Sequence, residues 1–147
     1  MKTNFTLFAF LLLGIQTAVA QQVVGSVKAP TGDGEIVSIP VVMSSGLGDL
    51  ARGGNGVVYV DPSVANLPYE FKQMLLAHEA YHALTNSMSE TSADCYAANV
   101  LRIAGFTPLQ MQVVYQGMAR HLSLFPDATH PGLQQRLEIV KGCYVRG

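Results

Sequence analysis

Two histidines on one predicted helix have the spacing that most directly predicts chemistry. His78 and His82 are four residues apart, so a helix directs both imidazole rings from one face toward a single metal ion. Glu79 lies beside them, and a carboxylate at that position polarises a metal-bound water whose pKa the metal has already lowered. The alternative interpretation is an ordinary amphipathic helix that carries two histidines by chance. The pattern alone therefore indicates a metal site that still needs a further ligand.

Two acids follow at a distance that suits this need, because a hydrolytic metal site takes a third protein ligand and keeps one position open for water. Glu90 and Asp94 are also four residues apart. The polar connection 86–89 is short, so the two helices are expected to form an antiparallel hairpin. In that hairpin His82 lies opposite Glu90, and His78 lies opposite Asp94. One carboxylate can bind the metal, and the other can accept the free ring N–H of a ligand histidine. The alternative is a first-turn acid favoured by the helix dipole, followed by a surface acid.

Four short motifs, in the same order, resemble those of the CaaX-prenyl-protease and heat-shock-protease type of gluzincin peptidases, over roughly residues 54–143. They are His78-Glu79-x-x-His82, Glu90-Thr91-Ser92-Ala93-Asp94, Ala104-Gly105-Phe106-Thr107-Pro108, and Thr129-His130-Pro131 with Arg136. The resemblance implies a zincin-like (gluzincin) catalytic core with one zinc ion held by His78, His82 and Glu90. It also implies that Asp94 orients His78. Family members usually have a much longer segment between the histidine motif and the ligand glutamate, whereas here only residues 83–89 intervene.

The late histidine and arginine have two interpretations. The resemblance implies that His130 and Arg136 approach the active site as catalytic groups, where donors can stabilise the oxyanion of the tetrahedral intermediate. Alternatively, His130 caps the last helix. Arg136 then forms a structural ion pair with Glu90 or Asp94.

These side chains need helices and strands to position them, and the hydrophobic pattern changes from one type to the other after Pro62. Strand-favouring sequences occur at 23–27, 35–43 and 57–60. Between the last two, the glycine-rich segment 44–56 is predicted to be a flexible loop. Helical patterns with recognisable ends occur at about 68–84, 89–105, 107–122 and 131–142. The predicted fold is therefore α+β, with a small N-terminal antiparallel or mixed sheet followed by about four helices.

The strand before the metal helix is predicted to bind substrate. If Val57, Val58 and Tyr59 form an edge strand, an extended peptide can add to the sheet through backbone hydrogen bonds. The glycines within 53–56 leave room for another backbone to approach. The alternative is a plain internal strand.

The N-terminus predicts export. Lys2, the apolar run 5–15 and Ala18-Val19-Ala20 indicate a signal peptide over residues 1–20, followed by a single periplasmic or secreted domain over 21–147. The apolar run is too short for a comfortable membrane span, so no stable span is expected in the mature chain. The formal net charge is −1 without a basic stripe, which argues against a nucleic-acid partner.

The two cysteines, Cys95 and Cys143, are predicted to form a disulfide in an oxidising compartment, with free thiols as the alternative.

Two functions follow from this sequence. The first is a zinc-dependent metalloendopeptidase that acts on peptide or protein substrates, with Glu79 as the general base. The second is a non-catalytic binding or quality-control module that keeps zinc for stability, which the short hairpin and the small size suggest.

Overall fold

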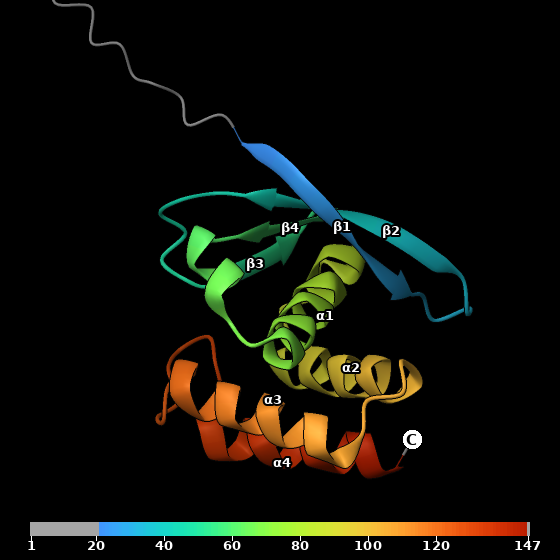
Figure 1. Cartoon of the computed structure of the whole chain (residues 1–147), viewed down its shortest axis with the longest axis vertical. Helices are drawn as coiled ribbons and strands as arrows, with labels where there is room; N and C mark the ends of the chain where they lie inside the picture. Colours follow the sequence, from blue (N-terminus) through green and yellow to red (C-terminus); the bar gives the residue numbers. More distant parts are fainter. Residues whose placement is uncertain (1–20, 147) are drawn as a thin grey trace, which may run out of the picture.

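The computed structural model describes residues 21–146, so the predicted signal peptide over 1–20 lies outside the described residues. A four-stranded mixed sheet comes first and four α-helices follow, which confirms the predicted α+β organisation (Figure 1). The strands are β1 (Gln22–Pro30), β2 (Ile36–Met43), β3 (Ala51–Gly54) and β4 (Val57–Val60). Their order across the sheet is β1-β2-β4-β3. β2 and β4 are parallel, while the two outer pairs are antiparallel.

Strand β3 lies within the segment 44–56 that was predicted to be a flexible loop, so that prediction was wrong for Ala51–Gly54. Ala51–Gly54 has little intrinsic strand propensity, but Asn55 and Gly56 both take positive φ, of 50° and 76°. An Asn-Gly pair in this conformation makes the tight two-residue turn of a β-hairpin, which folds β3 back onto β4. The turn is also tied to the end of the first helix, because the Gly56 N–H donates to the Ala83 carbonyl over 2.9 Å.

The helices begin and end close to the predicted positions. A short 3₁₀ helix, η1 (Pro62–Asn66), precedes α1 (Tyr69–Thr85), α2 (Glu90–Ile103), α3 (Pro108–His121) and α4 (Leu133–Arg146). Ser89 caps α2, and Thr107 forms a capping box with Gln110 at the start of α3. Helix α4 continues four residues past Gly142, the predicted end, because this glycine does not adopt the left-handed conformation that ends helices. Within residues 21–146, no helix is long and apolar enough to cross a membrane.

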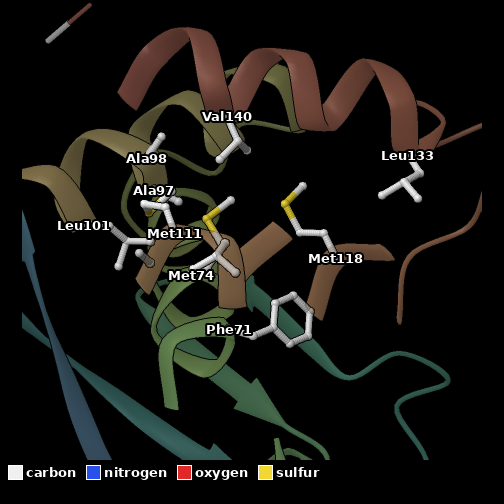
Figure 2. Close-up of a cluster of buried hydrophobic side chains, with 11 residues drawn as sticks. Phe71, Met74, Ala97, Ala98, Leu101, Met111, Met118, Leu133 and Val140 are labelled. Carbon is white, nitrogen blue, oxygen red and sulfur yellow. The ribbon is translucent and has the colours of Figure 1, made fainter. Parts of the chain in front are cut away.

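Helix α1 lies between the sheet and the other helices, and it is buried on both sides (Figure 1). Its residues Ala80 and Ala83 pack against sheet residues such as Val58 and Val60. Figure 2 shows the second core, in which Phe71 and Met74 of α1 meet apolar side chains of α2, α3 and α4. Small residues on the sheet side let α1 approach the strands closely. The two cores therefore pack against opposite faces of α1.

The Cys95–Cys143 disulfide is present and joins α2 to α4. Its two Cα atoms are 5.3 Å apart, and 48 positions separate the cysteines in sequence. In chain-entropy models, closing a loop of this length stabilises the fold by about 4 kcal/mol. The bridge also keeps α4 docked beside α2, next to Asp94.

Candidate metal centre

Three side chains converge in the α1–α2 hairpin as the helical spacing predicted. The Nε2 atoms of His78 and His82 are 3.2 Å apart. Glu90 at the start of α2 brings one carboxylate oxygen to 3.2 Å from His78 Nε2 and the other to 3.3 Å from His82 Nε2. Both histidines are buried, and the Glu90 side chain is only 11% exposed. These residues form a group that could hold a metal ion.

The second nitrogen of each ring fixes its orientation. His78 Nδ1 lies 2.9 Å from Asp94 Oδ1, and His82 Nδ1 lies 2.6 Å from the backbone carbonyl of Ser87. A carboxylate and a carbonyl only accept hydrogen bonds, so both Nδ1 atoms carry the hydrogen. In the neutral rings the lone pairs are therefore at Nε2 and face each other. This arrangement is typical of metal-binding histidines, whose second nitrogen donates to a carboxylate or a carbonyl.

The electrostatics of the site also favour a cation. Glu90 Oε2 is buried without a well-aligned hydrogen-bond donor. Burial alone lowers the pKa of His78, but the contacts with Asp94 and Glu90 outweigh burial and raise this pKa to about 9. Burial raises the pKa of Glu90, yet its contacts with His78 and His82 hold that pKa well below its ordinary value. In the metal-free protein the His78 ring therefore holds a proton between the two carboxylates, and a metal ion bound at this position would replace it.

Asp94 lies behind His78 and is held by an arginine from α4. Its side chain is fully buried, and Arg136 contacts both of its carboxylate oxygens, with Nε–Oδ2 at 2.8 Å and Nη2–Oδ1 at 2.7 Å. The structure thus contains the buried ion pair that the sequence analysis kept as one role for Arg136. Arg136 Nη2 also lies 3.9 Å from Glu90 Oε2. The second role of Arg136, stabilisation of the oxyanion, stays a prediction.

Glu79 is positioned by strand β3, a strand that was not predicted from the sequence. The Gly53 N–H donates to Glu79 Oε2 over 2.6 Å. A Cβ on Gly53 would lie 1.8 Å from the Glu79 carbonyl oxygen, so only glycine lets β3 approach α1 this closely. The Asn55-Gly56 dipeptide could have indicated this hairpin. Such a dipeptide is typical of a two-residue turn, so the strand at 57–60 predicts a partner strand directly before Asn55.

Replacing Gly53 with alanine is expected to push β3 away from α1 and to lower the free energy of unfolding by about 1–3 kcal/mol. Gly54→Ala is the matched control, because a Cβ at Gly54 meets no atom within 4 Å. Thermal or denaturant unfolding of both variants measures the difference. Equal stability of the two variants would contradict the close approach of β3 and α1.

Val57, Val58 and Tyr59 do not form the predicted edge strand. β4 pairs with β2 on one side and with β3 on the other, so both of its edges are occupied. The alternative interpretation as an internal strand is therefore confirmed. The sheet edge beside Glu79 belongs to β3.

His130 lies at the border of the site. It does not cap α4, which begins at Leu133. Its Nε2 is 3.9 Å from Glu90 Oε2, and its side chain is 40% exposed. Among the described residues it is not one of the atoms that converge on the metal-binding position. His130 is therefore a partly exposed neighbour of Glu90.

Comparisons of the chain with protein-family models, with curated proteins and with solved structures found no significant match.

Proposed function

We propose that the chain is an exported zinc-dependent peptidase of the gluzincin type, with a zincin-like core built from α1, α2 and β3. The observation that carries the proposal is the convergence of two imidazole Nε2 atoms and one carboxylate, with a second carboxylate, Glu79, beside them. The motif resemblance over residues 54–143 supports the same function.

The donor set and its spacing favour zinc. Ligand atoms about 2.0–2.1 Å from a tetrahedral zinc ion lie about 3.3–3.4 Å from one another. The two Nε2 atoms are 3.2 Å apart, which suits this spacing, while one oxygen of Glu90 lies 3.2 Å from His78 Nε2 and the other lies 3.3 Å from His82 Nε2. Imidazole ligands favour zinc and other transition metals over magnesium and calcium, and two histidines with one glutamate are a known catalytic zinc set. Three protein ligands leave a fourth position for water.

The residues around the metal position have distinct roles in the proposed reaction. Bound zinc supplies a water of lowered pKa and polarises the peptide carbonyl. Glu79 accepts the proton of that water, and the Gly53 N–H holds one of its oxygens so that the other can receive the proton. Asp94 keeps His78 in the tautomer that leaves Nε2 free. His130 lies beside Glu90, where it is placed to contact a bound substrate.

Strand β3 supports a peptide as the substrate. Because the Gly53 N–H points to Glu79, it points away from the ladder with β4. The outer edge of β3 therefore runs beside the catalytic carboxylate. An extended peptide can pair with the remaining outward-facing backbone groups of this edge, without depending on its own side chains.

The disulfide supports export. Structural disulfides form and persist in oxidising compartments, and both cysteines of the chain are paired. We therefore expect the protein to act in the periplasm or outside the cell.

Metal analysis and a cleavage assay test the proposal. The full chain is expressed with zinc supplied, purified from the exported fraction and analysed for metal. We expect about one zinc ion per chain, as the single site predicts. Cleavage of an unfolded protein such as casein should stop on removal of zinc with a chelator and return when zinc is added back. The absence of stoichiometric zinc would refute the proposal.

A second function is suggested by the short α1–α2 hairpin and the small size of the chain. In this case the protein is a binding or quality-control module that keeps zinc for stability. Zinc would then be present at the same stoichiometry, but the purified protein would cleave no unfolded protein.

A further inference from the structure

A cavity of about 500 Å³ lies where the β1–β2 turn, the C-terminal half of α1 and helix α2 meet. Tyr81 lines it from α1. Because Tyr81 follows Glu79 by two positions, the two side chains point to opposite sides of the helix. The candidate metal ligands His78, His82 and Glu90 do not line the cavity. The cavity is therefore separate from the metal centre.

The Tyr96 side chain joins two of the segments that surround this cavity. Its hydroxyl donates to the Pro30 carbonyl over 2.8 Å, which ties α2 to the end of β1. Its ring centroid lies 5.5 Å from that of Tyr81, and the two rings are tilted by 48°. These contacts hold the aromatic walls apart from any ligand. The cavity is therefore formed in advance, as small-molecule sites usually are.

The residues that line the cavity carry no charge and present mostly apolar surface. Leu84, Val100 and Ile103 supply aliphatic groups, and the two tyrosines supply aromatic ones. Burial raises the pKa of Tyr96 to about 12, so its hydroxyl stays neutral. A charged ligand would lose its hydration in such a cavity without gaining an opposite charge. The lining therefore favours a neutral ligand.

Asn99 supplies the polar group that is available to a ligand. Its Nδ2 lies 3.8 Å from the Cys95 sulfur, which is only a weak acceptor, so the amide can still bond a ligand. The hydroxyls of Thr31 and Thr85 also border the cavity, but they already bond to groups of their own segments. One amide among apolar and aromatic walls suits an aromatic ring that has a single polar group.

We propose that this cavity binds a small neutral aromatic molecule, whose ring packs against Tyr81 and Tyr96 and whose polar group bonds to the Asn99 amide. The volume falls within the range of about 300–1,000 Å³ that is typical of small-molecule sites. Aromatic rings attract one another in offset or edge-to-face arrangements, which two tilted tyrosines can offer to a third ring. The inference does not depend on the proposed peptidase function, because the metal ligands take no part in it.

Titration with indole, followed by nuclear magnetic resonance, tests the inference. Indole is a neutral aromatic molecule with one N–H donor, and indole-3-carboxylate is its charged counterpart. We expect indole to bind with a dissociation constant of about 0.1–1 mM, as suits a ligand of its size. The carboxylate should bind about 10-fold more weakly or worse. The ring signals of Tyr81 and Tyr96 should shift with indole, both in the metal-free and in the zinc-loaded protein.

Two variants assign the binding to this cavity. Ile103 lines the cavity but is 69% exposed, so Ile103→Trp should fold while its larger ring takes up the space of the ligand. We expect it to weaken indole binding about 10-fold or more. Val145→Trp is the control, because Val145 is 79% exposed on α4 and does not line the cavity. Asn99→Leu should weaken indole binding about 2–10-fold, but it should not weaken binding of 1-methylindole, which has no N–H to donate.

The inference is supported if indole binds in preference to its carboxylate, and if Ile103→Trp loses this binding while Val145→Trp keeps it. It is overturned if the wild type binds no indole at concentrations up to about 10 mM, which would leave an affinity too weak for a built site. Equal affinity for indole and indole-3-carboxylate, or unchanged indole binding in Ile103→Trp, would overturn it as well. Indole binding in a protein that holds no zinc would support this site and still refute the peptidase function.

Discussion

The protein is expected to lose tight zinc binding when Glu90 is replaced by alanine. Glu90 is the residue whose carboxylate bridges the two ligand histidines, with oxygens 3.2 and 3.3 Å from their Nε2 atoms. Without it, two imidazoles remain, and a stable zinc site needs at least three protein ligands. Competition with a chromophoric chelator measures the affinity, and circular dichroism verifies that the variant is folded.

Asp94 provides the comparison, because it contacts His78 on the side away from the metal position. Losing such a partner typically costs about 10–100-fold in metal affinity or activity. Asp94→Ala also leaves Arg136 buried without its partner, and breaking a buried ion pair destabilises a protein by about 3–5 kcal/mol. The double variant Asp94→Ala/Arg136→Leu removes both charges, so its zinc affinity reports the contribution of Asp94 to His78 with less loss of stability. If Asp94→Ala emptied the site while Glu90→Ala kept full affinity, the roles of the two carboxylates would be reversed.

The sequence could predict the convergence of the candidate metal ligands because these residues come from two helices joined by a short connection. Positions four apart share a face of a helix whatever the rest of the fold does. A short connection leaves few ways to pack the second helix against the first. His78, His82 and Glu90 could therefore be brought together by local rules. The separate roles of Glu90 and Asp94 required atomic positions, because both lie on the same face of α2.

The groups that position Glu79 and Asp94 could not be predicted in this way. Gly53 reaches Glu79 only because β3 pairs with β4 and the sheet packs on α1, and Ala51–Gly54 carries no hydrophobic pattern that indicates a strand. The internal place of β4 depends on its parallel pairing with β2, which is not visible in either strand alone. Arg136 meets Asp94 across 42 positions of sequence, through the docking of α4. Such contacts depend on tertiary packing rather than on local periodicity.

A large loss of activity without loss of the metal is expected from Glu79→Gln. Glutamine has nearly the same shape, and its carbonyl oxygen can still accept the Gly53 N–H, so β3 and α1 should stay in contact. Its amide cannot take a proton from water at neutral pH. General bases typically contribute about 10²–10⁴-fold, so kcat should fall by this factor while the zinc content stays unchanged. Single-turnover cleavage of an unfolded protein, together with metal analysis of the same sample, measures both quantities.

Glu70→Gln is the control for this experiment, because Glu70 lies in the first turn of the same helix and outside the metal centre. It removes the same charge from α1 without touching the proposed reaction, so kcat should be unchanged. The comparison also separates the two candidate functions. A binding module that keeps zinc for stability requires only the three ligands, so it would hold zinc equally well with glutamate or glutamine at position 79 and would perform its cellular role in both forms. If Glu79→Gln kept wild-type cleavage, Glu79 would not be the base, and the bond from Gly53 would serve only to join the sheet to the helix.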